Sequence, residues 1–226
     1  MPLDDRQNIP AQIHLEPVAA PSILGLYGYA AATFIVSAHL AGWYGNSRTA
    51  LVLFPFAAML GGLAQFTAGM WAYKARDGVA TAMHGIWGAL FLAYGMVAVM
   101  MARGTIVAAD LAPAVGFWFC ALTLITAAGA YAAMSENSVL AIVWAIVAIG
   151  SACASIAGWS ASGGWMALAA WVFILSSIVA WYAGSALMLE GAFGRAVWPL
   201  GMRQDAMTRS RVEFGMGEPG VIRGQA

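Results

Sequence analysis

Polar side chains that could do chemistry lie inside long apolar runs of this sequence. They are Thr33, Ser37, His39, Gln65, His84, Thr123, Thr126, Ser151, Ser155, Ser176, Ser177, Tyr182 and Ser185. Hydroxyl, amide and imidazole groups are costly in a lipid environment unless they form hydrogen bonds. They therefore either bond to neighbouring helices or line a route for something polar, and the sequence leaves both interpretations open.

The composition is that of a membrane protein. Of 226 residues, 62% are hydrophobic and only 9% are charged, and the mean hydropathy is +0.78, well above the range of soluble domains. Net charge is zero and no basic tract is interleaved with aromatics, so no nucleic-acid partner is expected. Cys120 and Cys153 lie in apolar runs and are expected to pack as small residues. No metal site, cofactor or enzymatic activity is predicted.

Six apolar runs have the length of about 20 residues that a membrane-spanning helix needs. We expect the spans at residues 22–44, 49–73, 79–102, 112–134, 139–159 and 165–189. The breaks between them are short: Pro113 is expected just inside the start of the fourth helix, and Ser135 or Asn137 caps the fifth. We predict an all-α integral membrane protein with a transmembrane domain at 21–201, between a flexible N-terminal tail at 1–20 and a C-terminal tail at 202–226.

The distribution of basic residues predicts the orientation. With six spans, both termini lie on one side of the membrane, together with the second and fourth connections. Lys74, Arg76 and Arg195 lie close to span ends on that side, whereas Arg48 and Arg103 lie on the other. Basic residues are enriched in cytoplasmic loops, so we expect a multi-pass protein of the cell's inner (plasma) membrane with both termini and both tails in the cytoplasm.

Three segments resemble the signatures of the acetate uptake transporters, a family of bacterial acetate/succinate permeases and yeast acetate and ammonia-export proteins. They are P-S-I-L-G-L-Y-G-Y-A from Pro21, G-G-L-A-Q-F-T-A-G-M-W-A-Y-K from Gly61 and F-G-R-A-V-W-P-L-G from Phe193. The first departs from the family pattern, because Ala20 and Ile23 replace an Asn and a second Pro; Ala72 and Leu187 stand where relatives often carry Glu. The resemblance implies six transmembrane helices per protomer around a central pore, a homohexamer, and transport of small monocarboxylates such as acetate, with succinate as a further substrate.

Helical phasing and the resemblance together select candidate pathway residues. At about 100° per residue, one stripe of the third span holds His84, Trp87, Gly88, Phe91 and Gly95, and one of the first holds Tyr29, Thr33, Val36 and Leu40. By family pattern, Tyr29, Trp87 and Val147 form a hydrophobic gate, which excludes hydrated ions by dewetting. The candidate substrate pathway is Tyr29, Thr33, Ser37, His39, Gln65, His84, Trp87, Phe91, Val147 and Tyr182, with Arg195 at the mouth.

Structural roles compete with transport roles at several of these positions. Gln65 lies between Gly61 and Gly69 at four-residue steps, a pattern that suits close helix packing, and both Gln65 and His39 could serve as interhelical hydrogen-bonding groups. His84 is expected near the cytoplasmic mouth. Arg195 could attract anions or anchor the last helix at the headgroups.

Three rival functions stay open. The first is a channel for another small solute, such as ammonia, lactate or a hydroxyacid. The second is the membrane anchor of a redox complex with a haem, although His39 and His84 lie about 25 Å and about 7 Å from the cytoplasmic end and are too far apart to share one iron. The third is an intramembrane serine protease, prompted by G-W-S-A from Gly158, but no histidine follows His84 to act as its base.

Overall fold

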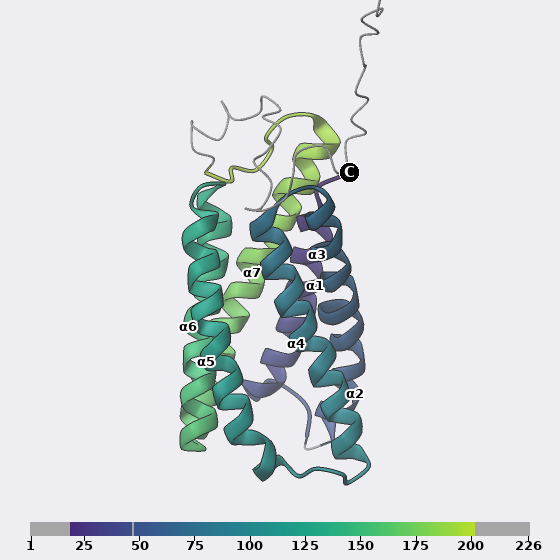
Figure 1. The fold of residues 1–226 in the computed structure, drawn as a ribbon, viewed down its shortest axis with the longest axis vertical. Coiled ribbons are helices and arrows are strands. Elements are labelled where there is room, and N and C mark those ends of the chain that lie inside the picture. Colours follow the sequence, from purple (N-terminus) through teal and green to yellow (C-terminus); the bar gives the residue numbers. More distant parts are fainter. Residues whose placement is uncertain (1–18, 47, 202–226) are drawn as a thin grey trace, which may run out of the picture.

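The computed structural model describes residues 19–46 and 48–201 (Figure 1). Apart from residues 19 and 20, the two predicted tails lie outside these ranges. Within them, six helical stretches are long and apolar enough to cross a membrane. They are Pro21–Leu40, Leu51–Lys74, Gly78–Ala102, Ala109–Ala133, Ser138–Ser160 and Gly163–Phe193. The all-α class and the six spans are therefore confirmed.

The spans run up and down along one long axis of the bundle (Figure 1). The elements are α1 (Pro21–Leu40), α2 (Thr49–Ala57), the π-helix η1 (Ala58–Ala64), α3 (Gln65–Lys74), α4 (Gly78–Ala102), α5 (Ala108–Ala133), α6 (Ser138–Ser160) and α7 (Gly163–Phe193). α1 packs against α7 on one side and against α2, η1, α3 and α4 on the other, and α5 pairs with α6. The start of α1 and the end of α7 lie at the same end of the bundle, which we call the terminal end; the other is the distal end (Figure 1).

The second span is not the single regular helix that the sequence predicted. Pro55 lies inside α2 and has no backbone N–H to donate, and the seven-residue π-helix η1 follows directly. A π turn holds more residues than an α turn, so it rotates the face that the following helix presents. Gln65, the first residue of α3, is wholly buried after this rotation.

Glycines allow the helices around α1 and α4 to approach closely, as the small-residue pattern predicted. A Cβ on Gly28 would lie 2.5 Å from the Leu60 carbonyl oxygen, and one on Gly69 would lie 2.8 Å from the Gly85 nitrogen. Backbone atoms cannot move aside as a flexible side chain can. These contacts fix the second span against α1 and α4 at a distance that only glycine permits.

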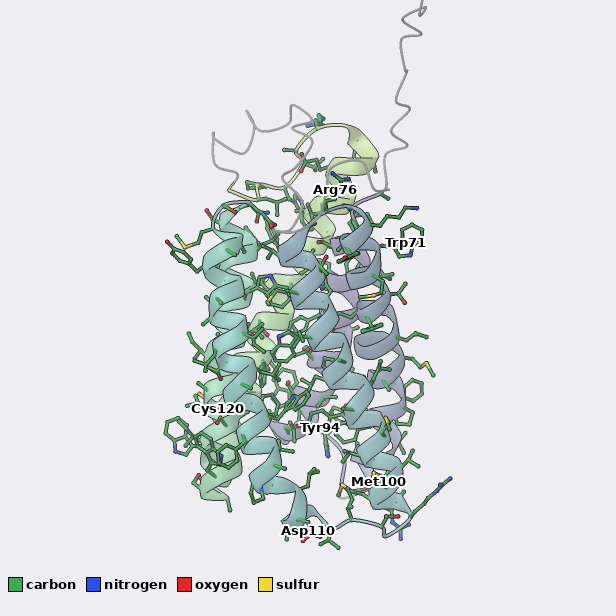
Figure 2. The ribbon with its side chains drawn as sticks, viewed as in Figure 1. Trp71, Arg76, Tyr94, Met100, Asp110 and Cys120 are labelled. Carbon is green, nitrogen blue, oxygen red and sulfur yellow. The ribbon has the colours of Figure 1, made fainter. Side chains whose placement is uncertain are left out.

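The starts of α4 and α6 follow from their capping residues. Asn137, one of the two predicted caps, accepts a hydrogen bond from the Leu140 N–H at 2.9 Å, and Asp77 accepts one from Ala80 at 2.8 Å. α5 begins at Ala108, four residues before the predicted start, so Pro113 lies inside the helix rather than at its first turn. Arg76 lies at the terminal end, and Met100 and Asp110 lie at the distal end (Figure 2).

Candidate solute pathway

Two cavities enter the bundle from opposite ends. The distal vestibule has a volume of about 510 Å³ and is lined by residues of α1, α2, α4, α5, α6 and α7. The terminal vestibule has a volume of about 1110 Å³ and lies among the terminal ends of α1, α4, α5 and α6. A solute small enough to enter either vestibule would meet the same barrier between them.

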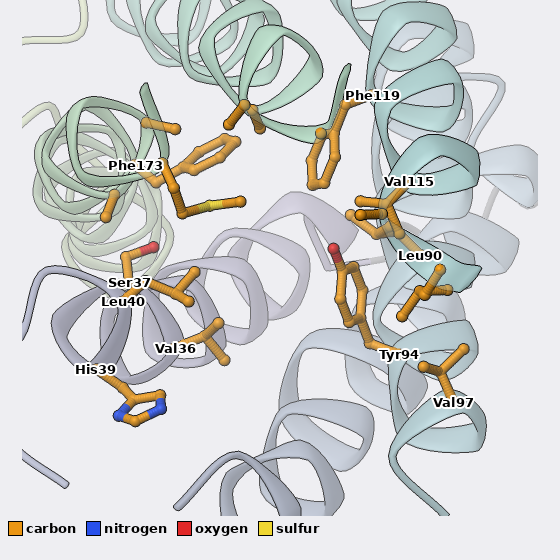
Figure 3. Close-up of a pocket in the computed structure, with 18 of the residues that line it drawn as sticks. Val36, Ser37, His39, Leu40, Leu90, Tyr94, Val97, Val115, Phe119 and Phe173 are labelled. Atoms are coloured by element: carbon orange, nitrogen blue, oxygen red, sulfur yellow. The ribbon is translucent and has the colours of Figure 1, made fainter. Parts of the chain in front are cut away.

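The distal vestibule is mostly apolar, with a few polar groups on its wall. Thr33, Ser37 and His39 of α1 line it, as does Tyr94 of α4. In Figure 3 the hydroxyl groups of Ser37 and Tyr94 point into the cavity. The His39 ring is partly exposed, and its Nδ1 lies 3.1 Å from the Tyr44 carbonyl oxygen, so His39 also holds the turn after α1.

Tyr94 was not among the predicted pathway residues. Its ring stacks on Phe54 of α2 with centroids 5.2 Å apart and an interplanar angle of 13°, which holds the side chain toward the vestibule. The sequence spacing could have identified it, because Tyr94 follows Trp87 and Phe91 on one face of the helix. All three residues line the distal vestibule.

A layer of buried side chains, the closing layer, separates the two vestibules. It comprises Leu26, Tyr29, His84, Trp87, Thr126, Trp144, Val147 and Ser176, of which Trp87 also lines the distal vestibule. Along α4, Met83 lines the terminal vestibule and Trp87 lines the distal one. At 1.5 Å of rise per residue the barrier is only about 6 Å thick there. The bundle is thus closed by roughly one helical turn of side chains.

Aromatic rings from three helices meet in the closing layer. The Tyr29 and Trp87 rings pack edge to face with centroids 5.8 Å apart, and Trp144 of α6 lies 6.0 Å from Tyr29. Two hydrogen bonds hold this cluster. The Tyr29 hydroxyl lies 2.7 Å from Ser176 Oγ, and the Trp87 indole N–H donates to Thr126 Oγ1 at 3.1 Å.

The three residues assigned to the gate from the family pattern lie together in this layer. Tyr29 and Val147 are 0% exposed and Trp87 is 2% exposed. Trp144 contacts Tyr29 directly but was not among the predicted residues. It precedes Val147 by three positions on α6, so helical spacing would have placed it on the same side of the helix.

Buried polar groups without partners lie in or beside the closing layer. Among the described residues, no hydrogen bond is made by Thr33 Oγ1, by His84 Nδ1 or by either amide atom of Gln65. Leaving a buried donor or acceptor unpaired costs about 1–3 kcal/mol. Gln65 enters the bundle beside Gly28 of α1, since its backbone nitrogen lies 3.5 Å from the position of a Gly28 Cβ. Such groups are available to a polar solute.

Three predicted residues, Gln65, Tyr182 and Arg195, lie outside both vestibule linings and outside the closing layer. Tyr182 donates a hydrogen bond to the Pro199 carbonyl oxygen at 2.9 Å and stacks on Trp198, so it ties the segment after α7 to the bundle. Arg195 is exposed beyond the end of α7 and does not line the terminal vestibule, whereas Arg76 does. His84, expected near the mouth, lies within the closing layer.

Two carboxyl groups also line the terminal vestibule. They belong to Asp77, the cap of α4, and to Glu136, in the turn between α5 and α6. Partial burial, and next the negative charge of Asp77, raise the pKa of the Glu136 carboxyl to about 7. The charge of this vestibule therefore changes near neutral pH.

Comparisons with known proteins agree with the six-helix architecture. None of the curated proteins searched matches the chain. A solved structure described as that of the bacterial acetate channel SatP superposes with a TM-score of 0.74 at 22% sequence identity, covering 82% of this chain and 100% of that one. A family model matches residues 6–194. On that match the chain belongs to the GPR1/FUN34/yaaH family, which confirms the resemblance to the acetate uptake transporters.

Proposed function

We propose that this protein transports small monocarboxylates, acetate first among them, across a membrane through a route inside each protomer. The observation that carries the proposal is the pair of vestibules that approach each other from opposite ends, separated along α4 by about one helical turn. The similar solved structure is described as an acetate channel, which supports acetate as the first solute to test. Succinate, a larger dicarboxylate, is the second.

The chemistry of the closing layer suits an uncharged solute. Within the described ranges it contains aromatic and aliphatic side chains, hydroxyls and one imidazole, but no Asp, Glu, Lys or Arg. Moving a bare carboxylate into such surroundings costs many kcal/mol. The undissociated acid carries no charge and avoids this cost, and it can still form hydrogen bonds. We therefore propose that acetate crosses this layer as acetic acid. Flux should then follow the concentration of the undissociated acid as pH is varied; flux that follows the anion and ignores pH contradicts this.

We further propose that the terminal end faces the cytoplasm of the cell's inner membrane. The support is the excess of basic residues near span ends on that side, with Lys74, Arg76 and Arg195 against Arg48 and Arg103 at the distal end. A reporter that is active only in the cytoplasm, fused after residue 226, should be active. An inactive reporter in a protein that still transports would reverse this orientation.

The oligomer is proposed to be a homohexamer, on the strength of the family resemblance. The second span leaves large apolar side chains exposed, among them Val52, Phe56, Met59 and Leu63, which suits contact with lipid or with a neighbouring protomer. Native mass spectrometry of the detergent-solubilised protein should give six chains per particle.

Uptake of labelled acetate into liposomes tests the function. Proteoliposomes should take up acetate faster than protein-free liposomes, and unlabelled acetate should compete better than lactate or succinate. Ammonia flux measured on the same preparation tests the alternative of another small solute. An absorbance scan of the purified protein tests the redox-anchor alternative. If none of the carboxylates shows protein-dependent flux, the proposed function is wrong.

A further inference from the structure

His84 occupies the centre of the barrier between the two vestibules. It lies on α4 between Met83, which lines the terminal vestibule, and Trp87, which lines the distal one. Its side chain is 1% exposed. Any solute that crosses between α1 and α4 at the narrowest part of the barrier must therefore pass this ring.

The surroundings of His84 are shaped to hold an imidazole. A Cβ added to Gly25 of α1 would lie 2.5 Å from the His84 ring, so the ring lies flat against the backbone of α1 where only glycine leaves room. The ring also packs edge to face on Trp144 of α6, with centroids 5.8 Å apart. A ring in contact with two helices keeps a fixed position relative to a passing solute.

The hydrogen-bonding capacity of the ring is unused. His84 Nδ1 is buried and makes no hydrogen bond with any described residue, and the groups that face the ring from α1 and α6 are a glycine and an indole. In either neutral tautomer Nδ1 is a donor or an acceptor, so one hydrogen bond is missing whichever nitrogen carries the proton. A residue serving only to fill space at this position would not need an imidazole.

We infer that His84 is the carboxyl-recognising residue of the barrier, an inference that rests on the proposed function. A carboxylic acid offers one O–H donor and one carbonyl acceptor, and neutral imidazole offers one lone pair and one N–H, so the two match without a net charge. The acid O–H donates to the unprotonated ring nitrogen as the solute crosses, and the bond is released on the far side. An amide of the same size forms a weaker bond to the same nitrogen, because its N–H is a poorer donor.

The ratio of acetate flux to acetamide flux tests this role, because the two molecules have nearly the same size and shape. His84→Leu should lower the ratio about tenfold, since the stronger bond of the acid is lost. Met96→Leu, a volume-conserving change on the same helix at an exposed position outside both vestibule linings, should leave the ratio unchanged. Gly25→Ala should lower the ratio by displacing the ring, and it should have no further effect on the ratio in a His84→Leu background.

The outcomes separate the two proposals. If the wild-type protein carries no acetate, the proposed function fails. If it does carry acetate and His84→Leu keeps the ratio within about twofold, or lowers both fluxes equally, the inference about His84 is overturned. Should His84→Leu not fold, ring ¹⁵N NMR of the full chain with His39→Gln gives the answer: acetate, but not acetamide, should shift a histidine signal that is missing in His84→Gln. An acetate titration with no such shift overturns the inference.

Discussion

The Tyr29 hydroxyl of α1 and the Ser176 Oγ of α7 lie 2.7 Å apart in the middle of the bundle, and neither residue is exposed. Ser176 donates its own proton to the Phe173 carbonyl oxygen at 2.7 Å, so the Tyr29 hydroxyl is the donor in the bond between the two helices. This bond holds the aromatic ring across the barrier. If the Tyr29 ring moves when the barrier opens, this bond opposes that movement.

Tyr29→Phe should increase acetate flux. The variant keeps the aromatic ring but removes the hydrogen bond that holds it, which is worth about 1 kcal/mol. If ring movement limits passage, a change of this size raises the open fraction about fivefold. Initial rates of labelled acetate uptake, normalised to reconstituted protein, measure the change.

Ser177→Ala provides the matched control. Ser177 is buried on the same helix and donates to the carbonyl of Ile174, but it makes no contact with Tyr29 in the hydrogen-bond network. Its flux should stay at the wild-type level. Equal increases in both variants, or no increase with Tyr29→Phe, would show that the bond between α1 and α7 does not hold the barrier closed.

Hydropathy alone was enough to predict the six spans, because a run of about 20 apolar residues has few other uses. It could not predict η1, since Pro55, Gly61 and Gly62 are compatible with either a kinked α-helix or a π-helix. Side-chain periodicity placed Tyr29 and Trp87 on one face of their helices but could not say which face turns inward. That depends on contacts with other helices. Trp144 and Tyr94 were missed even though their helical spacing from Val147 and Phe91 is visible in the sequence. Tyr182 was predicted on the pathway, but it contacts Pro199 and Trp198. These partners follow the last span, so the pattern within the span could not reveal them.

Thr126→Val should destabilise the protein. Valine has nearly the shape of threonine but no hydroxyl, so the Trp87 indole N–H would lose its acceptor while staying buried. The expected cost is about 1–3 kcal/mol, seen as a thermal midpoint lower by several degrees in detergent. Thr123→Val is the control, because the Thr123 hydroxyl donates within its own helix to Phe119. Similar midpoints for the two variants would mean that the bond between α4 and α5 contributes little.

Stability should fall as pH rises through the range in which Glu136 titrates. Its folded-state pKa of about 7 lies above the usual 4.5, so between these values the native state binds more protons than the unfolded state. By linkage, stability therefore decreases from about pH 4.5 to about pH 7 and stays lower above it. Glu136→Gln should be more stable than wild type at pH 8 and nearly equal at pH 4, as thermal midpoints would reveal.

Asp77→Asn separates the two causes of the raised Glu136 pKa. Asparagine keeps the cap of α4 but removes the neighbouring negative charge. Because burial is the larger cause, the pH dependence should shrink but persist. Complete loss of the pH dependence would mean that the charge of Asp77, rather than burial, raises the pKa of Glu136.

Two glycines of α4, three residues apart, give the sharpest test of the helix packing. A Cβ on Gly88 would lie 2.6 Å from the Phe66 backbone nitrogen and 2.8 Å from its Cα, whereas one on Gly85 would meet nothing within 4 Å. Gly88→Ala must push α3 away and should cost about 1–3 kcal/mol. Gly85→Ala should be neutral or stabilising by up to ~1 kcal/mol, since alanine favours the helix. The thermal midpoint of Gly88→Ala should therefore be lower than that of Gly85→Ala. A lower midpoint for Gly85→Ala would place α3 against a different face of α4.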